Sequence, residues 1–305
     1  MPGRILARLL HAALVIAGVS VAVFFLVRLG GDPTRLFLAP DAAPADIARF
    51  REQMGFDQPL AVQFGQFAWR GLHGDFGQSL RYGQPALRLV LERLPATIEL
   101  SAVALALSVM VGVPLAIMAA RHRGGVADRA GLVGSLVGQS FPAFWLGIML
   151  ILVFSEWLGM LPPSGRDGWR SLVLPAVSLA AYSTAIITRL LRANMIEVLQ
   201  SNHVRTARAK GLRERLVLLR HVLRNAAIPT VTVIGLQVGA LLGGAVVTEQ
   251  IFAWPGMGQL AIQAIANRDF AVVQAFVLTM AMVIMAVNLG VDATYALLDP
   301  RLRRD

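Results

Sequence analysis

Long uncharged apolar runs dominate this chain and alternate with shorter polar connections. Six of these runs have 18 residues or more, and a helix needs about 20 residues to cross the hydrocarbon core of a bilayer. The pattern therefore predicts an all-α integral membrane protein with six transmembrane helices. The predicted spans are 9–27, 100–120, 130–155, 171–188, 226–248 and 270–291.

The first run also resembles the core of a secretory signal peptide, because Arg4 and Arg8 precede it. It is longer than a usual signal core, and no small-x-small cleavage site follows it directly. We therefore expect residues 9–27 to be retained as a helix.

The connection between the first two spans, 28–96, is too polar to cross a membrane. Apolar residues at helical spacing predict a helix in its first part, and 85–94 predict a short amphipathic helix before Pro95. We divide the chain into an N-terminal helix with this segment, 1–95, and a five-helix core, 96–305. That core contains a cytoplasmic loop at 194–225.

Composition and charge support this class and set the orientation. The 305 residues have a mean hydropathy of +0.63 and only 15% charged side chains, a rare combination in a soluble domain. The net charge of +10 could suit a nucleic acid, but 17 of the 28 Lys and Arg residues lie in segments that one orientation places in the cytoplasm. By the positive-inside rule both termini are cytoplasmic, and no nucleic-acid partner is expected.

The chain lacks the motifs of common catalytic sites. It has no G-x-x-x-x-G-K-[ST] phosphate loop, no paired-His metal motif and no nucleophile elbow, and its five His residues are scattered. Without Cys it can form neither disulfides nor thiolate metal sites. We expect no enzymatic activity, no metal and no cofactor in this chain.

Polar residues within the spans are candidates for a translocation path, because they are costly in lipid and tend to face a cavity or a partner. The candidates are Gln139 and Ser140, which precede Pro142, and Gln237 and Glu249 in the fifth span. Glu249 could equally be an interfacial charge that reaches water.

Three glycines of the fifth span share one helix face at four-residue spacing. Such faces let helix backbones approach closely in lipid. Packing within the chain is the simpler interpretation, and packing against a second membrane subunit is the alternative. The three residues are Gly235, Gly239 and Gly243.

The most basic stretch of the chain is 203–225, with seven Lys or Arg residues and a single acid, Glu214. Within it Leu212, Leu216, Leu219 and Leu223 recur at intervals of four, three and four residues, which is typical of a helix face. Gly211 lies where a preceding short helix would end with positive φ. The stretch predicts a helix–Gly–helix hairpin, which could bind anionic lipid headgroups or dock a partner protein.

Several sequence strings resemble the permease subunits of ABC importers, and within them the dipeptide, oligopeptide and nickel branch. They follow the order of that family over nearly the whole chain. They are GDP (31–33), GDFGQSL (74–80), RLPATIEL (93–100), VRTARAKGL (204–212), LLRHVLRNAAIP (218–229), IFAWPGMG (251–258), RDF (268–270) and ALLDPR (296–301). The chain departs from the general importer loop motif, since Arg205, Thr206 and Ala207 stand in place of Glu-Ala-Ala.

The resemblance implies a role for the basic stretch. It would couple this permease to an ATPase subunit through a helix docked in the ATPase. The coupling residues would be Arg205, Thr206, Ala207, Lys210, Gly211 and Leu212.

The resemblance also implies partners and a location. The partners would be a second homologous permease subunit, two ATP-binding subunits, an extracytoplasmic substrate-binding protein and membrane lipid. The location would be the plasma (inner) membrane of a bacterium or archaeon, with several crossings. The fold would be the permease core of type I ABC importers.

Two other function classes compete with this one. A stand-alone secondary transporter or channel would favour inverted repeats and several carboxylates buried in mid-span, and neither is found in the sequence. A membrane-bound enzyme needs His or acidic residues clustered at span ends. The ligand stays open among peptides, glutathione-like peptides, nickel chelates and sugars.

Overall fold

The computed structural model describes residues 2–29, 43–53, 57–79 and 81–298. Within these residues the secondary structure is helical, with one isolated bridge between Gln78 and Pro85 and no β-strand. The predicted all-α class is therefore confirmed. The GDP motif at 31–33 and the last part of the ALLDPR motif, from residue 299, lie outside the described residues.

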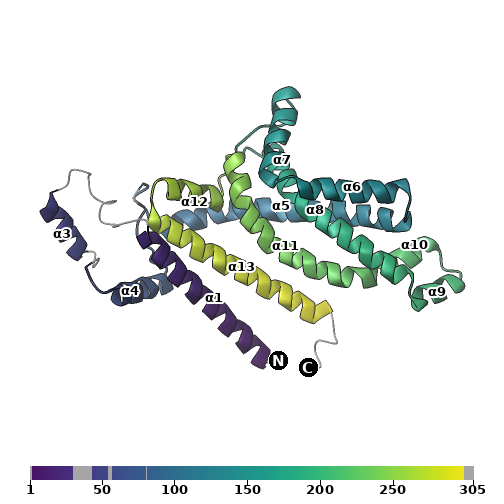
Figure 1. Cartoon of the computed structure of the whole chain (residues 1–305), viewed down its shortest axis with the longest axis horizontal. Coiled ribbons are helices and arrows are strands. Elements are labelled where there is room, and N and C mark those ends of the chain that lie inside the picture. Colours follow the sequence, from purple (N-terminus) through teal and green to yellow (C-terminus); the bar gives the residue numbers. More distant parts are fainter. Residues whose placement is uncertain (1, 30–42, 54–56, 80, 299–305) are drawn as a thin grey trace. The chain divides into compact units, whose positions relative to one another are not determined.

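Figure 1 shows the helices along the chain. They are α1 (Pro2–Leu29), α3 (Pro44–Gln53), α4 (Leu60–Leu72), α5 (Ala86–Arg121), α6 (Val126–Ser140), α7 (Ala143–Leu150), the π-helix η1 (Ile151–Trp157), α8 (Trp169–Leu199), α9 (Asn202–Ala209), α10 (Glu214–Leu216), the π-helix η2 (Val217–Val222), α11 (Leu223–Ile251), α12 (Met257–Ala266) and α13 (Phe270–Leu298).

Four segments of the described chain are long and apolar enough to cross a membrane. They correspond to the second, fourth, fifth and sixth predicted spans. The first predicted span, 9–27, lies in α1, whose described side chains include the apolar segment Ala13–Phe25. The four segments are Ala86–Arg121, Trp169–Leu199, Glu214–Ile251 and Phe270–Val291.

The third predicted span is not one straight helix. Its two parts, Asp128–Ser140 and Ala143–Trp157, are bent by 100° at the break between them. Phe141 is extended there, with φ −93° and ψ 128°, because a residue before proline is disfavoured in the helical region. Pro142 also lacks the N–H that would continue the helix.

The sequence pattern predicts that Pro95 separates two helices. In the structure it does not. Helix α5 runs through it without interruption for 36 residues. The neighbouring Ala96 and Leu100 are buried, so packing on that side holds the chain in helical form although Pro95 provides no N–H.

The chain forms two compact units. The first contains Met1–Pro95 and Gly256–Met285, and the second contains Ala96–Pro255 and Ala286–Asp305. In the first unit, the Phe24 ring packs edge-on against Phe64 at 5.2 Å between centroids. Ser79 there is buried and donates a hydrogen bond to Asp269, which precedes α13.

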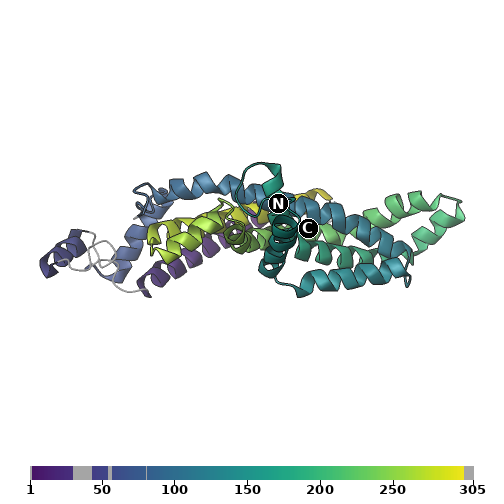
Figure 2. The ribbon, with the colours of Figure 1, turned by 90° about the horizontal axis from the view of Figure 1, so that it is seen from above.

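The second unit is built on the close packing of α5 against α8. A Cβ added to Gly112 of α5 would lie 3.2 Å from the Thr184 carbonyl oxygen of α8. Ser108 Oγ donates across the same interface to the Ala180 carbonyl, at 3.1 Å. Small residues allow this approach, and hydroxyl groups bind backbone carbonyls where water is absent. Figures 1 and 2 show that α6 lies alongside α8 in this unit.

Candidate functional site

The basic stretch forms the predicted helix–Gly–helix hairpin. Helix α9 ends at Ala209, Gly211 has φ +73°, and α10 begins at Glu214. A Cβ added to Gly211 would meet nothing within 4 Å. Glycine is therefore favoured here by the backbone conformation and not by lack of space.

An ion pair that the sequence did not reveal closes this turn. Arg208 Nη2 lies 2.7 Å from Glu214 Oε1, and Arg208 Nε donates to Glu214 Oε2 at 3.2 Å. The hydrogen bond that Arg208 donates to Glu214, together with the negative charge of Glu214, raises the pKa of the Arg208 guanidinium above its usual value. The single acid of the stretch thus joins α9 to α10 across Gly211.

The inner side of the hairpin packs on the chain's own core. Val204 and Ala207 of α9 are buried in a cluster with Met195 of α8, Ala120 of α5 and Val217 of η2. Ala207 was predicted among the ATPase-coupling residues; here it is 5% exposed and anchors α9. It therefore does not belong to the outer surface of the hairpin.

The outer side of the hairpin exposes apolar and basic residues together. The leucine stripe is largely on this side, since Leu212, Leu216 and Leu219 are between 36% and 46% exposed. The helix buries Val217, Leu218 and Val222 instead, within a π-helical stretch that shifts the positions sharing one face. Of the predicted coupling residues, the exposed ones are Arg205, Thr206, Lys210, Gly211 and Leu212.

The predicted path residues do not form one cluster. Gln139 is half-buried at the end of α6, where its Oε1 accepts a hydrogen bond from Arg189 Nη1 of α8 at 2.9 Å. Ser140 is exposed and donates to the Leu136 carbonyl. Gln237 and Glu249 lie further along the chain, both buried in α11.

Glu249 belongs to a buried polar network near the end of α11. Its side chain is fully buried, and Thr97 Oγ1 of α5 donates to its Oε1 at 2.6 Å. Trp254 follows in the turn after α11, and its Nε1 donates to the Ala96 carbonyl at 2.9 Å. The carboxylate therefore ties α11 to α5 and is not an interfacial charge in contact with water.

Gln237 lies in the middle of α11, about four turns from each end, and is 6% exposed. Its Nε2 has no hydrogen-bond acceptor among the described residues. A buried amide without its partner is unfavourable, so this position is a candidate for contact with another subunit or with a ligand.

The predicted glycine face of α11 is closely packed at Gly235 and open at Gly243. A Cβ on Gly235 would overlap the Val291 side chain of α13, so this glycine permits a close helix approach within the chain. Gly239 is half-buried, and Gly243 is exposed with nothing within 4 Å of an added Cβ. Packing within the chain thus accounts for Gly235 but not for Gly243.

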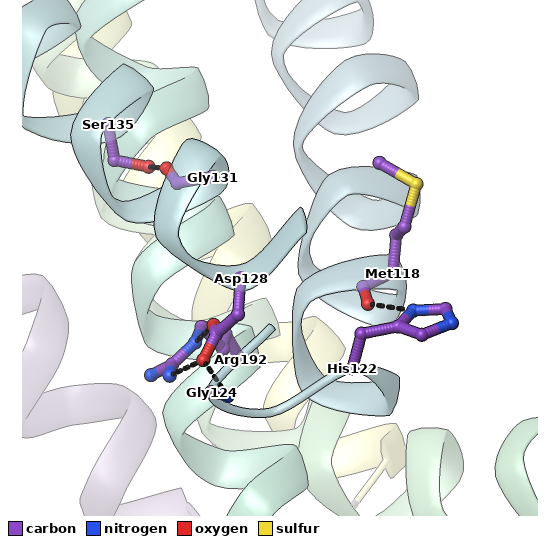
Figure 3. A network of polar contacts seen from close by, with 7 residues as sticks. All are labelled: Met118, His122, Gly124, Asp128, Gly131, Ser135 and Arg192. Atoms are coloured by element: carbon purple, nitrogen blue, oxygen red, sulfur yellow. Dashed lines mark hydrogen bonds and ion pairs between the residues drawn. The ribbon is translucent and has the colours of Figure 1, made fainter. Parts of the chain in front are cut away.

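A second ion pair, also missed from the sequence, joins α6 to α8 (Figure 3). Arg192 of α8 binds Asp128 through Nε and through Nη2, the latter at 2.7 Å from Oδ2. The Gly124 backbone N–H donates to the same Oδ2 at 2.8 Å. The Asp128 side chain is 4% exposed and that of Arg192 is 18% exposed. The two residues are 64 positions apart in the sequence. No local pattern in the sequence could therefore predict that they form a pair.

Comparison with known proteins decides the family. Residues 112–304 match the model of binding-protein-dependent transport system inner membrane components, and residues 1–101 match the N-terminal part of such components. The chain belongs to this family. It is therefore a permease subunit of an ABC importer, located in the inner membrane, and ATP is hydrolysed by separate ATPase subunits.

This permease is similar over its whole length to curated relatives. It is 41% identical over 304 residues to the glutathione transport system permease protein GsiC of Escherichia coli K12, covering 99% of both chains. It is 43% identical over 286 residues to the protein of the same name from Pectobacterium atrosepticum, covering 93% of this chain and 94% of the relative.

Solved structures support the fold of the permease. An inward-facing structure of the MetNI methionine ABC transporter has a TM-score of 0.57 at 17% identity and covers 69% of this chain and 96% of that chain. An amino acid ABC transporter crystallised with histidines has a TM-score of 0.52 at 18% identity, covering 70% and 94%. The predicted type I importer-like permease core is confirmed at the level of the fold.

Proposed function

We propose that this permease forms half of a translocation path for peptides or related small ligands, and that a second, homologous permease subunit forms the other half. Full-length similarity to permeases named for glutathione, itself a tripeptide, supports this ligand class. An extracytoplasmic binding protein delivers the ligand, two ATP-binding subunits drive the cycle, and the permease itself binds no cofactor.

The outer side of the hairpin is the proposed docking surface for an ATPase subunit. The observation that carries this proposal is the exposed leucine stripe, Leu212, Leu216 and Leu219, bordered by Arg205 and Lys210. Exposed apolar side chains rimmed by charge are typical of a protein interface, whereas binding to lipid headgroups needs only the charge. Since α10, η2 and α11 follow one another without a break, movement of the docked hairpin would pass directly into a membrane span.

The proposed orientation places both termini and the hairpin in the cytoplasm. The six predicted spans then alternate across the membrane, with the bent pair α6 and α7–η1 as the third. The excess of Lys and Arg in the short cytoplasmic segments supports this arrangement. Gln139, Ser140, Gln237 and Glu249 stay candidates for the path, with Glu249 holding α11 against α5.

Reconstitution of the complex tests the function. The purified permease alone should hydrolyse no ATP and take up no peptide, while the complex with its ATPases and binding protein should do both. Leu216→Ser should weaken co-purification of the ATPase. Leu158→Ser, at a 55% exposed leucine of the loop before α8, is the matched control and should have no effect. Peptide uptake by the permease alone would instead establish a stand-alone transporter.

A further inference from the structure

Arg189 is an exposed cation of α8, directly after the fourth predicted span, 171–188, and within the helix that is long and apolar enough to cross a membrane. Of its five side-chain N–H donors, one is engaged among the described residues, in the 2.9 Å hydrogen bond from Nη1 to Gln139 Oε1. The rest of the guanidinium is available to a ligand.

The guanidinium lies at a depth that belongs to the hydrocarbon core. A Cβ added to Gly138, next to Gln139, would lie 3.5 Å from the Ala181 carbonyl oxygen and 3.6 Å from Ala185 Cβ. Ala181 and Ala185 lie about 18 and 24 Å along α8 from Trp169, at 1.5 Å per residue. Both distances are within the roughly 30 Å of a bilayer core.

The Arg189 side chain points away from the nearer end of α8. Side chains lean toward the N-terminus of their helix, and Arg189 follows this direction from a Cα about one turn beyond Ala185. Arg192, about one turn further on, is held by Asp128 at the opposite end of α6. An arginine that faced lipid would extend its charge to the interface. The Arg189 side chain instead extends away from the nearer end of α8.

The neighbourhood of the guanidinium is also open. Helix α6 stops at Ser140, Ser140 is exposed, and the chain turns by 100° before α7. An exposed charge at this depth requires water or a partner group, because its solvation in hydrocarbon is costly.

We propose that Arg189, oriented by Gln139, is an anion-recognition site in the water-filled translocation path, and that it binds the carboxylate of a peptide-like substrate in transit. A planar guanidinium pairs with a carboxylate through two parallel hydrogen bonds. Gln139 holds one Nη1 N–H of the guanidinium and leaves the other donors for the ligand. This inference rests on the proposed function for the identity of the ligand, and on the geometry of α6 and α8 for the site.

Thiol labelling in the assembled complex tests the site without a substrate. The chain has no Cys, so Ser140→Cys provides a single thiol beside Gln139. Relative to their rates with a free thiol, anionic sulfonatoethyl methanethiosulfonate should be favoured over the cationic trimethylammonioethyl reagent by about fivefold, from the local Coulomb field. Arg189→Gln, which keeps a hydrogen-bonding partner for Gln139, should abolish this preference.

Val126→Cys is the matched control. It lies at the other end of α6 and is 84% exposed, about 20 Å away and beyond the screening length of about 10 Å. Its preference between the two reagents should not change with Arg189→Gln. If neither reagent reaches Ser140→Cys in any nucleotide state, the site faces lipid or protein and the proposal fails. A ratio of the two rates equal to that measured with a free thiol would show that a partner carboxylate or a lipid phosphate already neutralises Arg189, which also overturns the proposal.

Uptake of trialanine and trialaninamide tests the ligand. Arg189→Gln should raise the KM for trialanine by about tenfold, as expected for the loss of a charged hydrogen bond, and leave that for trialaninamide unchanged. Arg189→Lys should restore part of the difference. Equal effects on both peptides would contradict carboxylate recognition. If the wild-type complex transports neither peptide, the proposed ligand class fails, and the labelling result still decides whether the anion site exists.

Discussion

At the scale of single residues, glycines of similar appearance in the sequence have different physical roles. Gly211 is required by a φ of +73° in open space, whereas Gly235 is required by the proximity of Val291. The first reason concerns the backbone and the second concerns volume. The two predict different responses to the same substitution.

Gly211→Val should impair coupling while the permease still inserts. A β-branched residue at positive φ is strained by more than the roughly 1 kcal/mol expected for alanine, so the turn between α9 and α10 should be displaced. We expect loss of ligand-stimulated ATP hydrolysis and uptake in the reconstituted complex. Gly159→Val, at another open glycine with φ +60°, is the control for strain alone. Full uptake with Gly211→Val would show that the hairpin does not transmit movement.

Gly235→Ala should destabilise the permease by about 1–3 kcal/mol, the usual cost of overpacking. Val291→Ala removes the atoms that the new methyl group would meet, so the double variant should regain most of the loss. Gly243→Ala should be neutral, since nothing lies within 4 Å of its added Cβ. Thermal unfolding in detergent measures all four proteins. Equal effects at 235 and 243 would contradict close packing at Gly235.

At the scale of elements, two ion pairs decide how helices are joined. Arg208 and Glu214 close the hairpin at the surface, with side chains 44% and 47% exposed. Asp128 and Arg192 join α6 to α8 in a much less accessible place. Exposed pairs contribute little to stability, but breaking a buried pair leaves a charge without a partner.

Asp128→Asn should therefore lower the stability of the permease by about 3–5 kcal/mol at most, the range for broken buried pairs. Arg192→Gln should have an effect of the same sign. The control is Glu92→Gln, which breaks the exposed pair with Arg88 within α5 and should cost no more than about 0.5 kcal/mol. Thermal unfolding of the three variants provides the measurement, and similar losses for Asp128→Asn and Glu92→Gln would refute a buried tie.

At the scale of the whole molecule, the orientation in the membrane is the property that the other proposals need. The structure also shows where a topology probe should be placed. Ser79 is buried and bonded to Asp269, so a thiol there would be inaccessible from either side. Gln84, in the same segment, and Val126, the first residue of α6, are both exposed.

Single cysteines at these two positions should be labelled from opposite sides. An impermeant maleimide should label Gln84→Cys only from outside and Val126→Cys only from the cytoplasmic side of intact and inverted vesicles. The physical reason is the concentration of Lys and Arg in the short loops on one side. Labelling of Gln84→Cys from the cytoplasmic side alone would reverse the proposed topology.

Local patterns in the sequence determined the helical class, most apolar spans and the hairpin. Each depends on neighbours along the chain: about 20 apolar residues for a span, or a basic stretch broken by Gly211 for the hairpin. The family also followed from strings of adjacent residues. These features could be found without the fold because each depends on residues that follow one another along the chain.

Only the tertiary structure decided which face of each helix is buried and which distant residues meet. The leucines after Gly211 predicted an apolar face of the helix. In the structure, the π-helical stretch buries Val217, Leu218 and Val222 against the core around Met195 instead. Glu249 with Thr97, Arg192 with Asp128 and Arg189 with Gln139 are separated by 152, 64 and 50 positions. Such pairs leave no periodic signal, since their distance in space is set by how the helices pack and not by their spacing in the chain.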